Sequence, residues 1–166
     1  MLRIEVGPDD LAASRFAIAP MAELEHLLRR LGRPRGRAPS ARAFGSSRWA
    51  RRYDEVRGDL DARVLAALRA PSWGPDFIAP PPAGMARTPE DDLAVIRSTP
   101  LSVARAQIGR ALDLRRQPLA EDVRAVLERR DVVAWLAGAR DRLWQRLIGP
   151  GWPLLLAVVD RDVLYR

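Results

Sequence analysis

Apolar residues recur along most of this chain at steps of three and four positions, which is the spacing of one face of an α-helix. One such pattern extends from Trp49 to Leu68 and stops at Pro71, because proline cannot continue a helix. The longest pattern runs from Leu119 to Ile148, with Gly138 as a candidate interruption. The sequence therefore predicts a mainly α-helical bundle.

Capping signals indicate where further helices begin and end. Pro20 stands in the first turn of a helix that Gly32 is expected to end. Thr88 and Asp91 have the spacing of a capping box, with Pro89 at the first helical position. Further helix starts are expected at Asp9 or Asp10, at Thr99 and at Pro150.

The N-terminus is the one place where the pattern predicts a strand. From Leu2 to Val6 apolar and polar residues alternate, as in a strand that buries one face. An isolated strand leaves backbone hydrogen-bonding groups unsatisfied, so it needs a local or an external partner, such as a second subunit.

A Pro-rich loop over residues 70–87 separates the helical patterns and contains Trp73 and Phe77. A loop of this length with two large aromatic residues is rarely a plain linker. Packing of the two rings in an apolar groove is the favoured interpretation, and a pocket lid is the alternative.

The composition and the motifs of the sequence exclude several kinds of catalytic and metal-binding chemistry. The 166 residues are enough for one domain, and they include no cysteine and one histidine, His26, so thiolate chemistry is excluded. No Gly-rich phosphate loop, nucleophile elbow or paired-histidine metal motif is present. A non-enzymatic protein without a metal or cofactor is expected. No signal peptide or membrane-spanning run is evident, so a cytoplasmic location is expected.

Positive charge is concentrated in one segment. All 28 basic residues are arginine, and nine of them lie in residues 29–52 without any acidic residue. Residues 29–48 read as a flexible basic segment, because glycine, proline and serine are frequent there. A solvated loop is the favoured interpretation; the alternative is a contact with nucleic acid. The candidate residues for that contact are Arg33, Arg35, Arg37, Arg48, Arg51 and Arg52.

Five short sequence blocks occur in an order that resembles that of a known protein family. They are "MLRIEVGPDDLAASRFA", "FGSSRWARR", "PDFIAPP", "LAVIRSTP" and "WPLLLAVVDRDVLYR". Together they resemble the N-terminal region of ArsR-type winged helix-turn-helix transcription regulators of high-GC, actinomycete-like bacteria. The resemblance covers nearly the whole chain, and the third and last blocks are its most distinctive parts.

The resemblance implies one helical regulatory domain over residues 1–166, in which residues 150–166 form a connector helix to a winged-helix domain that is missing here. It implies a homodimer, and DNA binding by the full-length protein. The expected function is a non-catalytic effector-sensing or dimerisation module. The alternatives are a stand-alone helical protein-interaction module and an enzyme acting on an acidic substrate. The candidate lining residues of an effector pocket are Trp49, Tyr53, Trp73, Phe77 and Trp144.

Overall fold

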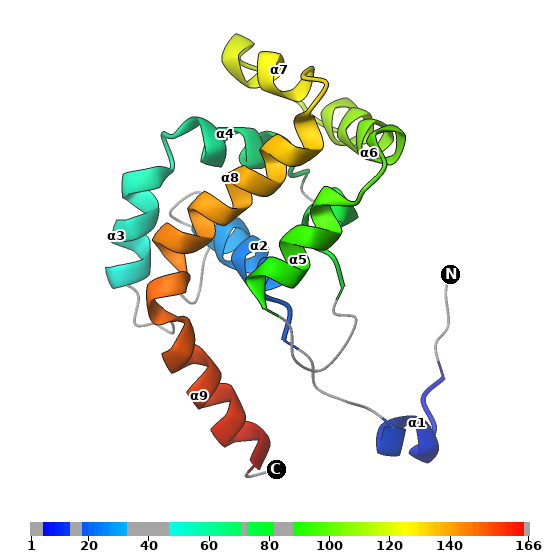
Figure 1. The fold of residues 1–166 in the computed structure, drawn as a ribbon, viewed down its shortest axis with the longest axis vertical. Helices are drawn as coiled ribbons and strands as arrows, with labels where there is room; N and C mark the ends of the chain where they lie inside the picture. The colour runs from blue at the N-terminus through cyan, green and yellow to red at the C-terminus, as the bar shows by residue number, and fades with distance from the viewer. Residues whose placement is uncertain (1–4, 14–17, 33–46, 71–72, 82–87, 165–166) are drawn as a thin grey trace.

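The computed structural model describes residues 5–13, 18–32, 47–70, 73–81 and 88–164, and these ranges contain nine α-helices, two 3₁₀ turns and no β-strand (Figure 1). The predicted α class is therefore confirmed. The elements are α1 (Pro8–Ala13), α2 (Pro20–Leu31), α3 (Ser47–Val56), α4 (Leu60–Ala67), η1 (Asp76–Ile78), α5 (Pro89–Arg97), α6 (Leu101–Asp113), α7 (Glu121–Leu127), α8 (Val132–Leu147), η2 (Gly149–Gly151) and α9 (Trp152–Leu164).

Helix α8 is the central element of the bundle. It packs against α2, α3, α4, α5, α6 and α7, and Figure 1 shows it crossing the middle of the molecule. Its buried side chains cover more than one face, as expected for a helix surrounded by others. They include Val132, Leu136, Leu143 and Leu147, each at most 1 % exposed.

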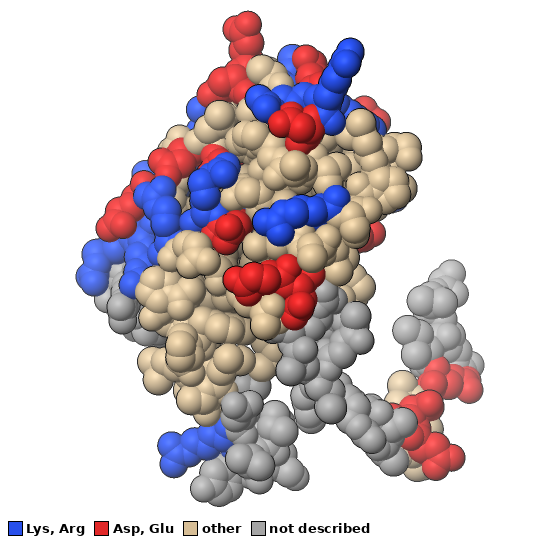
Figure 2. All heavy atoms as spheres, in the orientation of Figure 1, with Lys and Arg blue, Asp and Glu red and all other residues tan. Residues whose placement is uncertain are grey.

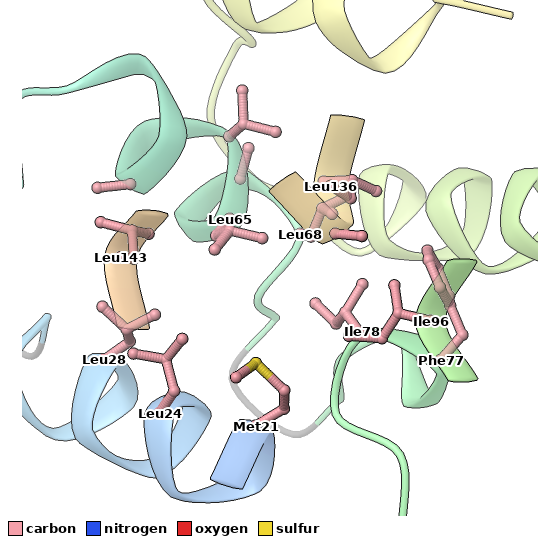
Figure 3. Packing of buried hydrophobic residues seen from close by; sticks show 14 of the residues in the cluster. Met21, Leu24, Leu28, Leu65, Leu68, Phe77, Ile78, Ile96, Leu136 and Leu143 are labelled. Atoms are coloured by element: carbon pink, nitrogen blue, oxygen red, sulfur yellow. The ribbon is translucent and has the colours of Figure 1, made fainter. Parts of the chain in front are cut away.

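The core forms where α2 and α4 meet α8. Met21 and Leu24 from α2, Leu65 from α4, and Leu136 and Leu143 from α8 all belong to one cluster of buried side chains (Figure 3). All five side chains are at most 1 % exposed. Burying each such side chain contributes roughly 1.5–3 kcal/mol, so these three helices supply much of the apolar stabilisation.

Two of the predicted helices begin where their capping signals indicate. Pro20 opens α2, and Gly32 follows its last residue. At the start of α5, the Thr88 hydroxyl accepts a hydrogen bond of 3.2 Å from the Asp91 amide, and the Asp91 carboxylate accepts one of 2.8 Å from the Thr88 amide. Both signals are local, which is why they could be read without knowing the packing.

The two longest patterns are each divided, contrary to the prediction of continuous helices. The first breaks between α3 and α4, where Asp59 adopts an extended backbone with φ −66° and ψ 149°. The second breaks between α7 and α8, at residues 128–131, and Gly138 lies inside α8. Periodicity continues across both breaks because the flanking helices face the same core.

The predicted strand is not supported. Residues 2–4 lie outside the described residues, and Glu5, Val6 and Gly7 form no regular structure before α1. Val6 is 60 % exposed, so it does not bury a strand face. Thr99 does not cap α6, which begins at Leu101; its hydroxyl instead donates a hydrogen bond of 3.4 Å to the Val95 carbonyl.

Candidate interaction site

The final helix, α9, leaves the bundle after the short turn η2. Proline at the second position of η2 and again at the second position of α9 favours helix starts there, as predicted for residues 150–166. Figure 1 shows α9 extending away from the other helices, and it packs chiefly against η2. Its residues therefore have few neighbours from the bundle.

Apolar side chains on α9 remain exposed. Leu154 is 71 % exposed, Val158 is 59 % and Leu155 is 38 %. Residues 152–159 include no charged residue, and Figure 2 shows a largely uncharged surface over the beginning of this helix. A contiguous exposed apolar surface of this kind is typical of an interaction site.

The five aromatic residues predicted to line a pocket form two separate groups, each with its own neighbours. Trp49 and Tyr53, from α3, and Trp144, from α8, pack at or against the core. The Trp144 ring meets the Trp152 ring edge-on, with centroids 4.9 Å apart. This first group lies where α3, α8 and η2 come together.

Trp73 and Phe77 form the second group, next to α6. The Arg110 guanidinium lies 4.7 Å from the centroid of the Trp73 ring, and the Phe77 amide donates a hydrogen bond of 3.4 Å to the Gln107 side chain. Phe77 is 7 % exposed. The described part of the 70–87 loop therefore folds back onto the bundle, whereas residues 71–72 and 82–87 lie outside the described residues.

The arginines predicted to contact nucleic acid are only partly described. Arg33, Arg35 and Arg37 lie outside the described residues, and Arg48 is placed in the first turn of α3. Arg51 is exposed on α3, whereas Arg52 is half-buried. At the ends of the segment predicted to be flexible, residues 29–31 belong to α2, Gly32 is its C-cap, and residues 47–48 begin α3.

A buried ionic cluster went unnoticed in the sequence. The Glu25 carboxylate accepts hydrogen bonds from Arg69, at 2.9 Å, and from Arg140, at 3.1 Å, and it forms an ion pair with Arg29 at 2.9 Å. Arg140 is fully buried and also donates to the Met21 carbonyl. The cluster ties α2 to α8 and to the segment after α4.

Glu25 and Arg140 both remain charged at neutral pH. Burial acts to raise the pKa of Glu25, but the guanidinium groups of Arg69, Arg140 and Arg29 outweigh it and hold that pKa below its ordinary value. Burial lowers the pKa of Arg140 to about 10, against the opposing effect of Glu25. Glu25 is therefore a carboxylate held by three cations, which is a structural arrangement and a poor general base.

The spacing of residues along α2 did not reveal this cluster, because its partners are far away in sequence. The apolar run of α9 was visible in the sequence, but its exposure was not.

His26 is exposed on α2, and the described residues contain no group of three potential metal ligands. Within the same residues, no helix has both the length and the apolar character needed to cross a membrane.

Comparison with known proteins provides no relative from which a role could be transferred. The chain matches no family model, no curated protein and no solved structure. The candidate site is therefore defined by the exposed apolar residues of α9 and by the contacts at its base.

Proposed function

We propose that this protein is a non-catalytic dimerisation module of a bacterial transcription regulator, and that α9 pairs with α9 of a second copy. The observation that carries the proposal is the exposure of Leu154, Leu155 and Val158 on a helix that projects from the bundle. Each apolar side chain left in water forgoes the free energy that burial in an interface supplies.

A second copy suits this surface better than a lipid bilayer does. Residues 152–159 are uncharged, so two copies meet there without repulsion between like charges. The next residues, Asp160, Arg161 and Asp162, carry both signs. Helices that lie on membranes usually flank their apolar face with basic residues, and acidic residues are repelled by anionic lipids.

The regulatory role rests on the resemblance to ArsR-type regulators, in which a DNA-reading domain follows this region. A two-fold interface joins identical surfaces of two subunits. Pairing of α9 would place two such domains about a two-fold axis, the arrangement that matches two half-sites on DNA. DNA binding would therefore depend on the dimer.

Dimerisation is favoured over effector sensing by the packing of the aromatic residues. Trp144 and Phe77 are nearly buried within the core, and Trp49, Tyr53 and Trp73 pack against it. Within the described residues, packing against the bundle accounts for the placement of these rings, whereas no neighbour there covers the exposed residues of α9.

Sedimentation equilibrium over a range of protein concentrations tests the proposal. We expect the unaltered chain to form a dimer and Val158→Glu to shift it to a monomer. The dimer contains two copies of the substitution, one from each chain, so its free energy of association is expected to fall by roughly 3–6 kcal/mol. This loss raises the dissociation constant by about 10²- to 10⁴-fold.

Val103→Glu is the matched control, because Val103 is 43 % exposed on α6, away from α9. This variant is expected to dimerise like the unaltered chain. Circular dichroism verifies that both variants keep their helices. A chain that is monomeric at every concentration, or a Val158→Glu variant that dimerises normally, would contradict the proposal.

A further inference from the structure

The direction in which α9 leaves the bundle is decided at η2, which contains only three residues. Two described backbone hydrogen bonds close this turn: one from the Gly151 amide to the Ile148 carbonyl, at 2.8 Å, and one from the Trp152 amide to the Gly149 carbonyl. The Trp144 and Trp152 rings meet across the turn at an interplanar angle of 69°. These contacts join α8 to α9, but all of them are local, because α8, η2 and α9 follow one another directly in the sequence.

Trp49 adds a contact from a different part of the sequence. Its ring lies directly against Gly151: a β-carbon placed on that glycine would be 3.2 Å from Cη2 and 3.3 Å from Cζ2 of the ring. These distances are shorter than ordinary van der Waals contact. The missing side chain of Gly151 therefore lets the Trp49 ring pack closely against η2.

Arg52 strengthens the same junction. Its guanidinium lies 5.7 Å from the centroid of the Trp49 ring and donates a hydrogen bond of 3.4 Å to the carbonyl of Leu147, the last residue of α8. One turn of α3 thus contacts both the end of α8 and the turn that follows it.

We propose that Trp49, held by Arg52, is a positioning residue that sets the angle of α9 and so presents Leu154 and Val158 to the second copy. The presentation part of this inference rests on the proposed function. Without the Trp49 ring, one face of η2 loses its packing, and α9 samples a wider range of directions about the turn.

The absence of cysteine allows a direct test, because two introduced cysteines accept nitroxide labels without competition. Ser102→Cys on α6 and Arg161→Cys on α9 place labels at exposed positions on the bundle and on the projecting helix. Pulsed electron paramagnetic resonance measures the distance between them. Diluting the labelled protein in excess unlabelled protein removes distances between copies.

We expect one narrow distance distribution in the otherwise unaltered chain and the loss of that single peak in Trp49→Ala. Trp73→Ala is the matched control, since Trp73 is also a partly buried tryptophan with an arginine over its ring. It is expected to leave the distribution unchanged. Gly151→Ala is the second test, because its methyl group pushes against the Trp49 ring and shifts the peak without removing any aromatic side chain.

An unchanged distribution in both Trp49→Ala and Gly151→Ala would overturn the inference. If Trp49→Ala fails to fold, as judged by circular dichroism, Gly151→Ala decides alone. The dimer is assessed separately by sedimentation. If the protein is monomeric and its distance distribution broadens in Trp49→Ala, the proposed dimer is rejected and the positioning role of Trp49 is retained. If the protein is a dimer and the distribution does not broaden, the dimer is retained and the positioning role is rejected.

Discussion

The Arg140 guanidinium donates a hydrogen bond of 3.1 Å to the Glu25 carboxylate, across 115 positions of sequence and inside the helical bundle. Arg140 is fully buried and Glu25 is 7 % exposed. Removing one member of such a pair leaves the other as an uncompensated buried charge, which is costly. The pair therefore holds α2 and α8 in one relative arrangement.

Glu25→Gln is expected to lower the free energy of unfolding at pH 7 by about 3–5 kcal/mol, because Arg140 loses its buried anion. Chemical denaturation followed by circular dichroism measures this change. Asp131→Asn, which removes the exposed partner of Arg129, is the control and is expected to have a much smaller effect. Equal effects of the two substitutions would mean that the buried position of Glu25 adds nothing.

The same carboxylate predicts an acid dependence of stability. The pKa of Glu25 is lower in the folded protein than its ordinary value of 4.5, so the stabilisation is present above that value. It is lost as the pH falls through 4.5 toward the folded pKa, since the unfolded chain binds the proton first. Glu25→Gln is expected to lose less stability over this interval than the unaltered chain does. Parallel pH profiles for the two proteins would contradict this.

Thr88→Ala is expected to destabilise the protein by about 0.5–2 kcal/mol, because the substitution removes the hydroxyl that caps α5. Ser98→Ala is the control at the other end of α5, where the serine hydroxyl donates to the Val95 carbonyl at an exposed site. Its effect is expected to stay within about 0.5 kcal/mol. Thermal denaturation compares the two.

Arg105 connects α6 to the end of α7 and is expected to stabilise that short helix. Its guanidinium donates to the carbonyls of Leu127, Glu128 and Arg129, with 2.9 Å to Glu128. Arg105→Met is expected to cost about 1.5–3 kcal/mol and to speed amide hydrogen exchange within α7. Arg97→Met, at an exposed arginine near the end of α5, is the control. Unchanged exchange in α7 of Arg105→Met would reject the role.

Leu136→Ala is expected to be the most damaging of the simple truncations, at about 2–5 kcal/mol, because this side chain is fully buried in α8. Leu114→Ala provides the comparison, since Leu114 is 45 % exposed after α6. Urea denaturation measures both. Similar losses for the two variants would contradict the central place of α8 in the core.

Local signals determined much of this fold. The helical class follows from apolar spacing, and the ends of α2 and the start of α5 follow from Pro20, Gly32 and the Thr88–Asp91 capping box, because each involves residues within one or two turns. The apolar character of α9 could also be read from the sequence. None of these features depends on how the helices pack.

The packed bundle decided the rest. Spacing alone could not show that the patterns break near Asp59 and before Asp131, because helices on both sides of each break face one core. It could not pair Glu25 with Arg140, or bring Trp49 onto Gly151, since these contacts join distant segments. Whether Leu154 and Val158 are buried likewise depends on where α9 points, and that direction is set by contacts at η2 and not by the residues of α9 alone.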